Sequence, residues 1–152
     1  MEEDLRELYQ QVILDHGRKP RNFGALEGAN HEAEGFNPLC GDQIHVFLKV
    51  SPNETVDGVR FTGSGCTICT ASASLMTASI QGKSKREIGA MFEKFHDLVA
   101  GTNGSKSPDE VLGKLSVFGG VREFPIRVKC ATLPWHTLKA ALEDDHQVVT
   151  TE

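Results

Sequence analysis

The sequence predicts a mixed fold in which one antiparallel β-hairpin is combined with several helices. Hydrophobic and polar residues alternate in two stretches, 43–50 and 55–62, which is the period of a half-buried strand. Stretches before and after these repeat hydrophobic residues at helical spacing. The 152 residues are 39% hydrophobic and 24% charged, as in globular proteins that bury a core. Together these observations exclude a disordered, collagen-like or coiled-coil chain.

The N-terminal region is expected to hold one amphipathic helix. Its hydrophobic residues recur at helical spacing from Asp4 to Leu14, with charged and amide residues between them. Gly17 and Pro20 are expected to end this helix. The residues that follow, up to Pro38, are rich in glycine and asparagine and are expected to be irregular.

The hairpin comes next, and its turn is explicit in the sequence. Ser51-Pro52-Asn53-Glu54 contains residues typical of turns and lies between the two alternating stretches. The simplest pairing of 43–50 with 55–62 is therefore antiparallel.

Four helices are expected in the C-terminal half. They are Thr67–Ile80, a helix from Ser84 through Leu98, a helix from Ser107 through Phe118, and Trp135–Glu143. Ser84 and Glu87 have the spacing of a capping box, and Gly119-Gly120 is expected to break the third of these helices. Pro134 is expected to start the last helix, which places Cys130 in or just before a preceding turn. No repeat or long linker divides the chain, so residues 1–152 are expected to form a single domain.

Charge and hydropathy narrow the classes of partner. Sixteen Lys and Arg against 21 Asp and Glu give a net charge of −5, so no nucleic-acid partner is expected. The stretch 61–82 lacks charges, but 11 of its 22 residues are Gly, Ser or Thr, and no membrane span is expected. The acidic N-terminus lacks the features of a leader sequence. We therefore expect a cytoplasmic protein whose cysteines bind metal or carry out thiol chemistry.

Three cysteines are expected at the ends of elements, as a site assembled by folding requires. Cys40 precedes the first strand, with Asp42 two residues later. Cys66 follows a glycine-rich loop at the start of a helix, where backbone amides and the helix dipole favour a thiolate. Cys130 follows Lys129, with Arg127 nearby. Zinc takes four ligands from thiolate, imidazole and carboxylate groups, so these cysteines and Asp42 could form a complete set.

Cys69 leaves a second ligand set open. With Cys66 it forms a C-x-x-C, which would give an all-thiolate set with Cys40 and Cys130. A helix beginning near Thr67 would instead turn Cys69 toward the core, where it would pack as a small hydrophobic residue.

The sequence resembles the IscU/NifU N-terminal family of iron–sulfur assembly proteins. The resemblance is carried by three ordered motifs: Asn37-Pro38-x-Cys40-Gly41-Asp42; Phe61-x-Gly63-x-Gly65-Cys66-x-Ile68-x-x-Ala71-Ser72-x-Ser74; and Arg127-x-Lys129-Cys130-Ala131-x-Leu133-x-Trp135. It extends back to the first helix through Asp15-His16-x-x-x-Pro20-Arg21-Asn22-Phe23-Gly24 and covers nearly the whole chain. Lys129, where scaffold members have histidine, and an insertion-like segment around Gly101 to Gly120 resemble the SufU branch of this family.

The resemblance implies an α+β fold, with a small antiparallel sheet of the hairpin plus a third strand, covered by helices. It implies zinc on Cys40, Asp42, Cys66 and Cys130. In the SufU branch a pyridoxal-phosphate cysteine desulfurase passes persulfide sulfur to the residue matching Cys40, and downstream iron–sulfur assembly proteins receive it. The implied function is that of a zinc-dependent sulfurtransferase. The segment 101–120 is expected to be an exposed loop and short helix that shapes a partner surface.

Two other functions remain open. An iron–sulfur cluster could be assembled on the same cysteines and passed to apo-proteins, since thiolates bind both metals. Lys129 favours the transferase, because an ammonium group has no lone pair to give a cluster. Zinc could also be purely structural, although closed structural sites prefer Cys and His to a carboxylate such as Asp42. Arg127 could orient Asp42, bind an acidic partner surface, or be a solvated cation at a helix end.

Overall fold

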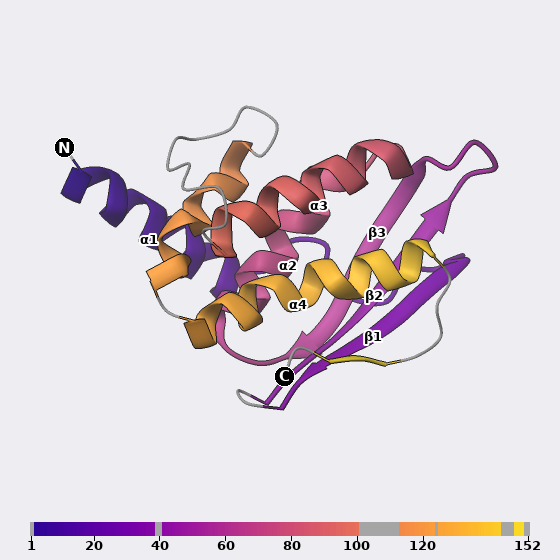
Figure 1. Ribbon diagram of the computed structural model, residues 1–152. Coiled ribbons are helices and arrows are strands. Elements are labelled where there is room, and N and C mark those ends of the chain that lie inside the picture. Colours follow the sequence, from indigo (N-terminus) through magenta and orange to yellow (C-terminus); the bar gives the residue numbers. More distant parts are fainter. Residues whose placement is uncertain (1, 39–40, 101–112, 124, 144–147, 151–152) are drawn as a thin grey trace.

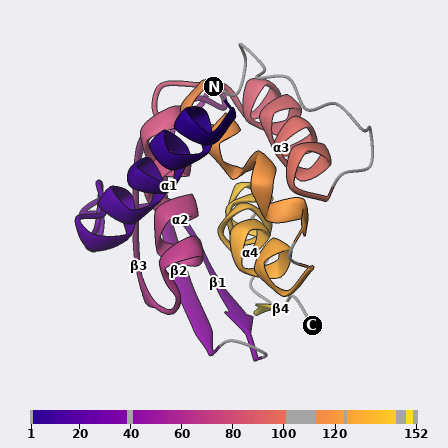
Figure 2. The ribbon, with the colours of Figure 1, turned by 90° about the vertical axis from the view of Figure 1, so that its left-hand side faces the viewer.

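Two helices lie directly on one face of a β-sheet in the computed structural model, and the others pack on those two (Figures 1 and 2). The structure describes residues 2–38, 41–100, 113–123, 125–143 and 148–150. The elements are, in chain order, α1 (Glu2–Arg18), β1 (His31–Asn37), β2 (Asp42–Val50), β3 (Val56–Ser64), α2 (Thr67–Ile80), α3 (Lys85–Ala100), the 3₁₀ helix η1 (Gly113–Glu123), α4 (Pro125–Leu142) and β4 (Val149–Thr150). α4 lies against β1 and β2, and α2 lies against β3 and α4. α1 packs on α2, while α3 packs on η1 and α4. The expected α+β class is confirmed.

The sheet is built on the expected hairpin. Its strand order is β3-β2-β1-β4, with β1, β2 and β3 antiparallel and the short β4 parallel to β1. The hairpin strands differ from the expected ranges by one or two residues at their ends. The inward residues of β2, Ile44, Val46 and Leu48, are buried, as the alternation predicts. The open edge of β3 is bordered by residues 22–24, since Gly24 N donates to Phe61 O at 2.8 Å and Phe61 N to Asn22 O at 3.1 Å.

Strand β1 lies within the stretch that was expected to be irregular, and that expectation is wrong. The inward positions of β1 are Ala33, Gly35 and Asn37, so the strand has no hydrophobic alternation to reveal it. A Cβ at Gly35 would overlap Thr137 Oγ1 of α4 and lie 3.0 Å from Leu133 Cδ1. The close approach of α4 therefore requires a small residue in the middle of β1.

Helix α1 runs past Gly17, which was expected to end it. A Cβ at this position would lie 2.5 Å from Thr67 Cγ2, so the glycine serves close packing of α1 against the start of α2. Helix α2 has the expected ends, and Gly82 follows it with a φ of 83°. The capping box before α3 is confirmed: Glu87 N donates to Ser84 Oγ and Ser84 N to Glu87 Oε1, both at 3.1 Å.

The last two helical elements depart from expectation. η1 continues through Gly119 and Gly120 to Glu123, so these glycines do not break it. Of the segment 101–120, residues 101–112 lie outside the described residues, and with them the expected exposed loop and the expected helix start at Ser107. Helix α4 begins ten residues before Trp135, with Pro134 inside it. Because proline has no N–H, Pro134 cannot donate a hydrogen bond to the carbonyl of Cys130, four residues earlier. The helix continues without this one bond, and most of its residues around Pro134 are buried.

The core is formed where α2, α3, η1 and α4 meet above the sheet. Phe95 stacks on Trp135 with 4.9 Å between ring centroids and meets Phe118 edge-on at 5.7 Å. All three rings are at most 1% exposed. Leu115 and Phe118 of η1 point inward, as predicted from their spacing.

Among the described residues, no helix is long and apolar enough to cross a membrane.

Candidate metal centre

Three potential ligands from distant parts of the chain meet at one point. Asp42 opens β2, Cys66 immediately precedes α2, and Cys130 lies in the second turn of α4. A carboxylate oxygen of Asp42 and the two sulfurs all lie within 4.8 Å of one another. Asp42 and Cys130 are completely buried, and Cys66 is half-buried. The site therefore opens toward solvent on the side of Cys66.

The Asp42 carboxylate is fixed by two donors and by the absence of a side chain at Gly65. Cys66 N donates to Asp42 Oδ1 at 2.8 Å, and Asn37 Nδ2 donates to Asp42 Oδ2 at 3.3 Å. A Cβ at Gly65 would overlap Asp42 Oδ1 and lie 3.0 Å from its Cα. The glycine-rich loop that precedes Cys66 therefore requires glycine at position 65, where it passes over Asp42.

Cys66 has the surroundings of a stabilised thiolate. It is the N-cap of α2, with an extended backbone at φ −73° and ψ 163°. The pKa of Cys66 is lowered to about 6, chiefly by a hydrogen bond with the Cys130 thiol, and the backbone amides of Cys69 and Ile68 act in the same direction. Burial and the Asp42 carboxylate oppose this effect by raising the pKa. The amides at the helix start stabilise the negative charge of the thiolate, as the dipole argument predicts.

Cys130 and Asp42 share a donor that the sequence analysis did not single out, Asn37. This residue is completely buried at the end of β1, directly opposite Asp42 in the strand pairing. Its Nδ2 lies 3.6 Å from Cys130 Sγ as well as 3.3 Å from Asp42 Oδ2. Cys130 is also near its own helix backbone, with its sulfur 3.6 Å from Ile126 O. The family-like motif contains Asn37, but only the strand register reveals that it bridges two potential ligands.

The donor set fits a zinc ion. Ligand atoms on tetrahedral zinc, with bonds of 2.0–2.3 Å, lie roughly 3.3–3.8 Å apart. Because the observed donors lie within 4.8 Å of one another, binding zinc requires them to approach by at most roughly 1–1.5 Å. A buried carboxylate beside thiolates is also costly without a compensating cation. Asp42, Cys66 and Cys130 would hold three corners of a tetrahedron.

Comparison with protein families agrees with this arrangement. Residues 8–144 match the family described as the NifU-like N terminal domain. The chain belongs to this family. The resemblance expected from the motifs is therefore confirmed, and the chain is a member of the iron–sulfur cluster assembly family that includes IscU and SufU proteins.

Curated relatives with similar sequence identity to this NifU-like domain are named for two different functions. One is the iron-sulfur cluster assembly scaffold protein IscU of Streptococcus pyogenes serotype M1, 38% identical over 91% of this chain and 85% of the relative. Another is the zinc-dependent sulfurtransferase SufU of Bacillus subtilis (strain 168), 40% identical over 90% of each chain. A solved chain from Fervidobacterium islandicum AW-1, a candidate scaffold protein for the SUF system, superposes with a TM-score of 0.80, at 33% identity over 90% of this chain and 97% of its own.

The remaining site predictions fall in three places. Cys40 lies outside the described residues. Cys69 is 3% exposed and lines a small cavity against β2 and β3, with Ile44 and Phe61. It is not one of the three clustered donors. Arg127 is exposed and Lys129 is half-buried, both in the first turns of α4 that lead to Cys130.

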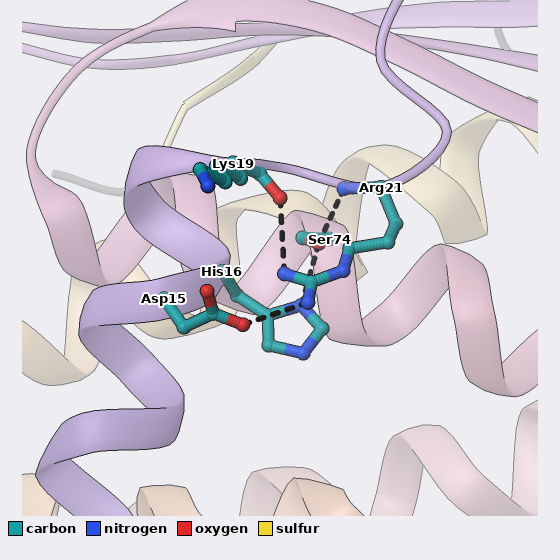
Figure 3. A network of polar contacts seen from close by, with 5 residues as sticks. All are labelled: Asp15, His16, Lys19, Arg21 and Ser74. Atoms are coloured by element: carbon teal, nitrogen blue, oxygen red, sulfur yellow. Dashed lines mark hydrogen bonds and ion pairs between the residues drawn. The ribbon is translucent and has the colours of Figure 1, made fainter.

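The N-terminal motif of this NifU-like domain fastens α1 to the helix that follows Cys66 (Figure 3). Ser74 Oγ of α2 accepts from Arg21 N at 2.8 Å and lies 2.7 Å from His16 Nδ1. Arg21 also donates to Lys19 O at 3.0 Å and pairs with Asp15 at 2.7 Å. Burial lowers the pKa of His16, with the Arg21 charge acting in the same direction. A neutral His16 can accept a hydrogen bond from the Ser74 hydroxyl, while the same hydroxyl oxygen accepts a hydrogen bond from Arg21 N.

Proposed function

We propose that this chain is a zinc-dependent sulfurtransferase that accepts sulfur from a cysteine desulfurase during iron–sulfur cluster assembly. The observation that carries the proposal is the cluster of Asp42, Cys66 and Cys130 donors within 4.8 Å. A carboxylate in the set and an open side are typical of zinc sites that do chemistry, whereas closed structural sites favour Cys and His alone. The similarity to a relative named as a zinc-dependent sulfurtransferase supports the same role.

Cys40 is proposed as the fourth ligand and the sulfur acceptor. It stands two residues before Asp42, and two residues of chain span at most about 7 Å, so the tether reaches the site. Gly41 has a φ of 70°, a conformation that glycine adopts without strain and that allows a tight turn between them. When bound, zinc would keep its thiolate ligands ionised at neutral pH.

The transfer step is a thiol–persulfide exchange. The Cys40 thiolate attacks the terminal sulfur of the desulfurase persulfide, forming a new S–S bond on Cys40. The original S–S bond breaks, and the desulfurase cysteine leaves as a thiolate. Cys66 and Cys130 remain in place because helices α2 and α4 anchor them, while Asn37 holds Asp42. Arg127 and Lys129 precede Cys130 on α4, and we propose that they face the partner.

Scaffold activity is the second candidate, favoured by the 38% identity to a relative named as an IscU scaffold. In that case the cysteines would hold an iron–sulfur cluster before its delivery to apo-proteins. The half-buried Lys129 beside Cys130 supports the transferase, since it offers a cluster no lone pair.

Metal content of the air-free protein separates the two candidates. We expect a colourless protein with one zinc per chain. Cys66→Ser should lose zinc because its sulfur is one of the three clustered donors. Cys69→Ser is the matched control and should keep it. Brown protein with iron and sulfide in place of zinc would favour the scaffold. Zinc lost from Cys69→Ser but retained by Asp42→Ala would favour the all-thiolate set.

A further inference from the structure

Two sulfurs of the candidate metal centre lie close enough to react with each other. Cys66 Sγ and Cys130 Sγ are within 4.8 Å of each other, and the two side chains share a hydrogen bond. A disulfide has about 2.05 Å between its sulfurs, so the pair must approach by at most about 2.8 Å. Rotation of one cysteine side chain to another staggered position moves its sulfur by such a distance. Little more than side-chain movement is therefore required to join them.

The two sulfurs differ in their access to solvent. Cys66 is half-buried at the opening of the site, whereas Cys130 is completely buried. A reagent from solvent therefore meets Cys66 first. Asn37 Nδ2 lies 3.6 Å from Cys130 Sγ, and an amide donor there stabilises negative charge on this sulfur. Cys66 is thus placed to react with an oxidant, and Cys130 is placed to react with the oxidised Cys66.

The carboxylate beside the pair favours its oxidation. Asp42 Oδ2 lies 4.0 Å from Cys66 Sγ, and the two groups repel each other when Cys66 is a thiolate. A disulfide carries no charge, so its formation removes this repulsion. Asp42 can then keep its hydrogen bonds from Cys66 N and Asn37 Nδ2.

We propose that Cys66 and Cys130 form a reversible disulfide when the metal-free protein meets a hydroperoxide, and that this bond blocks metal binding. The inference rests on the proposed function, because it takes both sulfurs to be zinc ligands. The Cys66 thiolate attacks a peroxide oxygen, the O–O bond breaks, and Cys66 becomes a sulfenic acid while hydroxide leaves. The Cys130 thiol then attacks the Cys66 sulfur, the S–O bond breaks, and the hydroxyl leaves with the thiol proton as water. Two thiols are oxidised and one peroxide is reduced.

Zinc and the disulfide exclude each other. When both sulfurs bind zinc, both share their lone pairs with the metal, so the zinc-loaded protein should resist the peroxide. The disulfide in turn removes two of the three clustered donors, and Asp42 alone cannot provide a tetrahedral set. Oxidation of the metal-free chain therefore holds the thiols in a form that a reductant restores, in place of an irreversible sulfinic acid.

Cys69 is the competing partner, since it lies three residues from Cys66. It contributes a backbone amide to Cys66, and its side chain lines the cavity with Ile44 and Phe61. It does not belong to the group of donors that lie within 4.8 Å of one another. Trypsin separates the two products, because Cys66 and Cys69 share the peptide 61–83 while Cys130 lies in the peptide 130–139.

The test uses reduced protein that a chelator has freed of metal. It is treated with hydrogen peroxide, alkylated, digested with trypsin and mapped by mass spectrometry. Wild type should link peptide 61–83 to peptide 130–139, and its zinc uptake should fall below about one-tenth and return to at least about nine-tenths after dithiothreitol. Zinc-loaded protein should form the link at least about 10-fold more slowly.

Two variants separate the roles of the thiols. Cys69→Ser is the matched control and should form the same link at the same rate. In Cys130→Ser, Cys66 should proceed to sulfinic acid, which dithiothreitol does not reduce.

Three results would overturn the thiol pair. They are a bond within peptide 61–83 as the main product, a bond from either peptide to the one that contains Cys40, and equal oxidation rates of metal-free and zinc-loaded protein. Failure of the proposed function looks different. Reduced protein that takes up no zinc contradicts the zinc site, while the disulfide map of the same sample still decides whether Cys66 and Cys130 pair.

Discussion

Replacing Gly65 with alanine should damage the metal centre without touching a ligand. The new Cβ would overlap Asp42 Oδ1 and lie 3.0 Å from both Cα and Cγ of Asp42, where ordinary contacts begin near 3.4 Å. The carboxylate must therefore move by at least about 0.4 Å at Cγ and further at its oxygen. That oxygen accepts the 2.8 Å hydrogen bond from Cys66 N, which the movement would break.

The expected cost follows from that lost bond and from the crowding. A hydrogen bond to a charged group contributes about 1.5–3 kcal/mol, and overpacking adds about 1–3 kcal/mol, so the free energy of unfolding should fall by roughly 2.5–6 kcal/mol. Zinc affinity should fall about 10- to 100-fold, as is usual when a ligand loses its supporting contact. Urea unfolding and competition with a zinc chelator measure the two quantities.

Gly89→Ala is the matched control. Gly89 lies within α3, and a Cβ there would have nothing within 4 Å. The same chemical change should stabilise the protein by about 0.5–1 kcal/mol through helix propensity and leave zinc affinity unchanged. The reasoning is refuted if Gly65→Ala binds zinc as tightly as Gly89→Ala does.

Two further perturbations test the surroundings of the site. Asn37→Ala removes the donor that reaches both Asp42 and Cys130, so chelator competition should show zinc affinity lowered about 10-fold, and an unchanged affinity would remove Asn37 from the site. Burial lowers the pKa of His16 and His136 below 6.5, so the unfolded chain binds more protons and stability should fall as pH drops below about 6.5. Urea unfolding at pH 7.5 and 5.5 should show a smaller loss in His16→Asn than in wild type; an equal loss would exclude His16 as a source.

The parts of the fold that follow from local sequence were predictable. Helix α2 and the hairpin have strong periodicity, and the Ser84–Glu87 capping box marks the start of α3. Strand β1 could not be found this way, because its inward positions meet other requirements than hydrophobic burial. Gly35 lies against α4, and Asn37 hydrogen-bonds to Asp42. Gly35 has no side chain because Thr137 of α4 occupies that space, and a glycine in this position gives no strand signal in the sequence.

The residues that could donate to a metal at the candidate site were predictable, but the residues that hold them in place were not. Thiolate and carboxylate donors at element ends indicated Asp42, Cys66 and Cys130, and the fold brings these three together. The placement of Cys130 inside α4 was missed, because Pro134 looks like a helix start when tertiary packing is unknown. The bridging role of Asn37 depends on its register opposite Asp42, which only the paired strands determine.

Mapping the transferred sulfur tests the central claim most directly. Zinc-loaded protein is incubated with a cysteine desulfurase and cysteine, thiols and persulfides are trapped by alkylation, and the modified peptides are identified by mass spectrometry. The account predicts the added sulfur on Cys40, and no stimulation of desulfurase turnover by Cys40→Ser in samples that still hold zinc. Persulfide mainly on Cys66, Cys69 or Cys130, or full stimulation by Cys40→Ser, would contradict it.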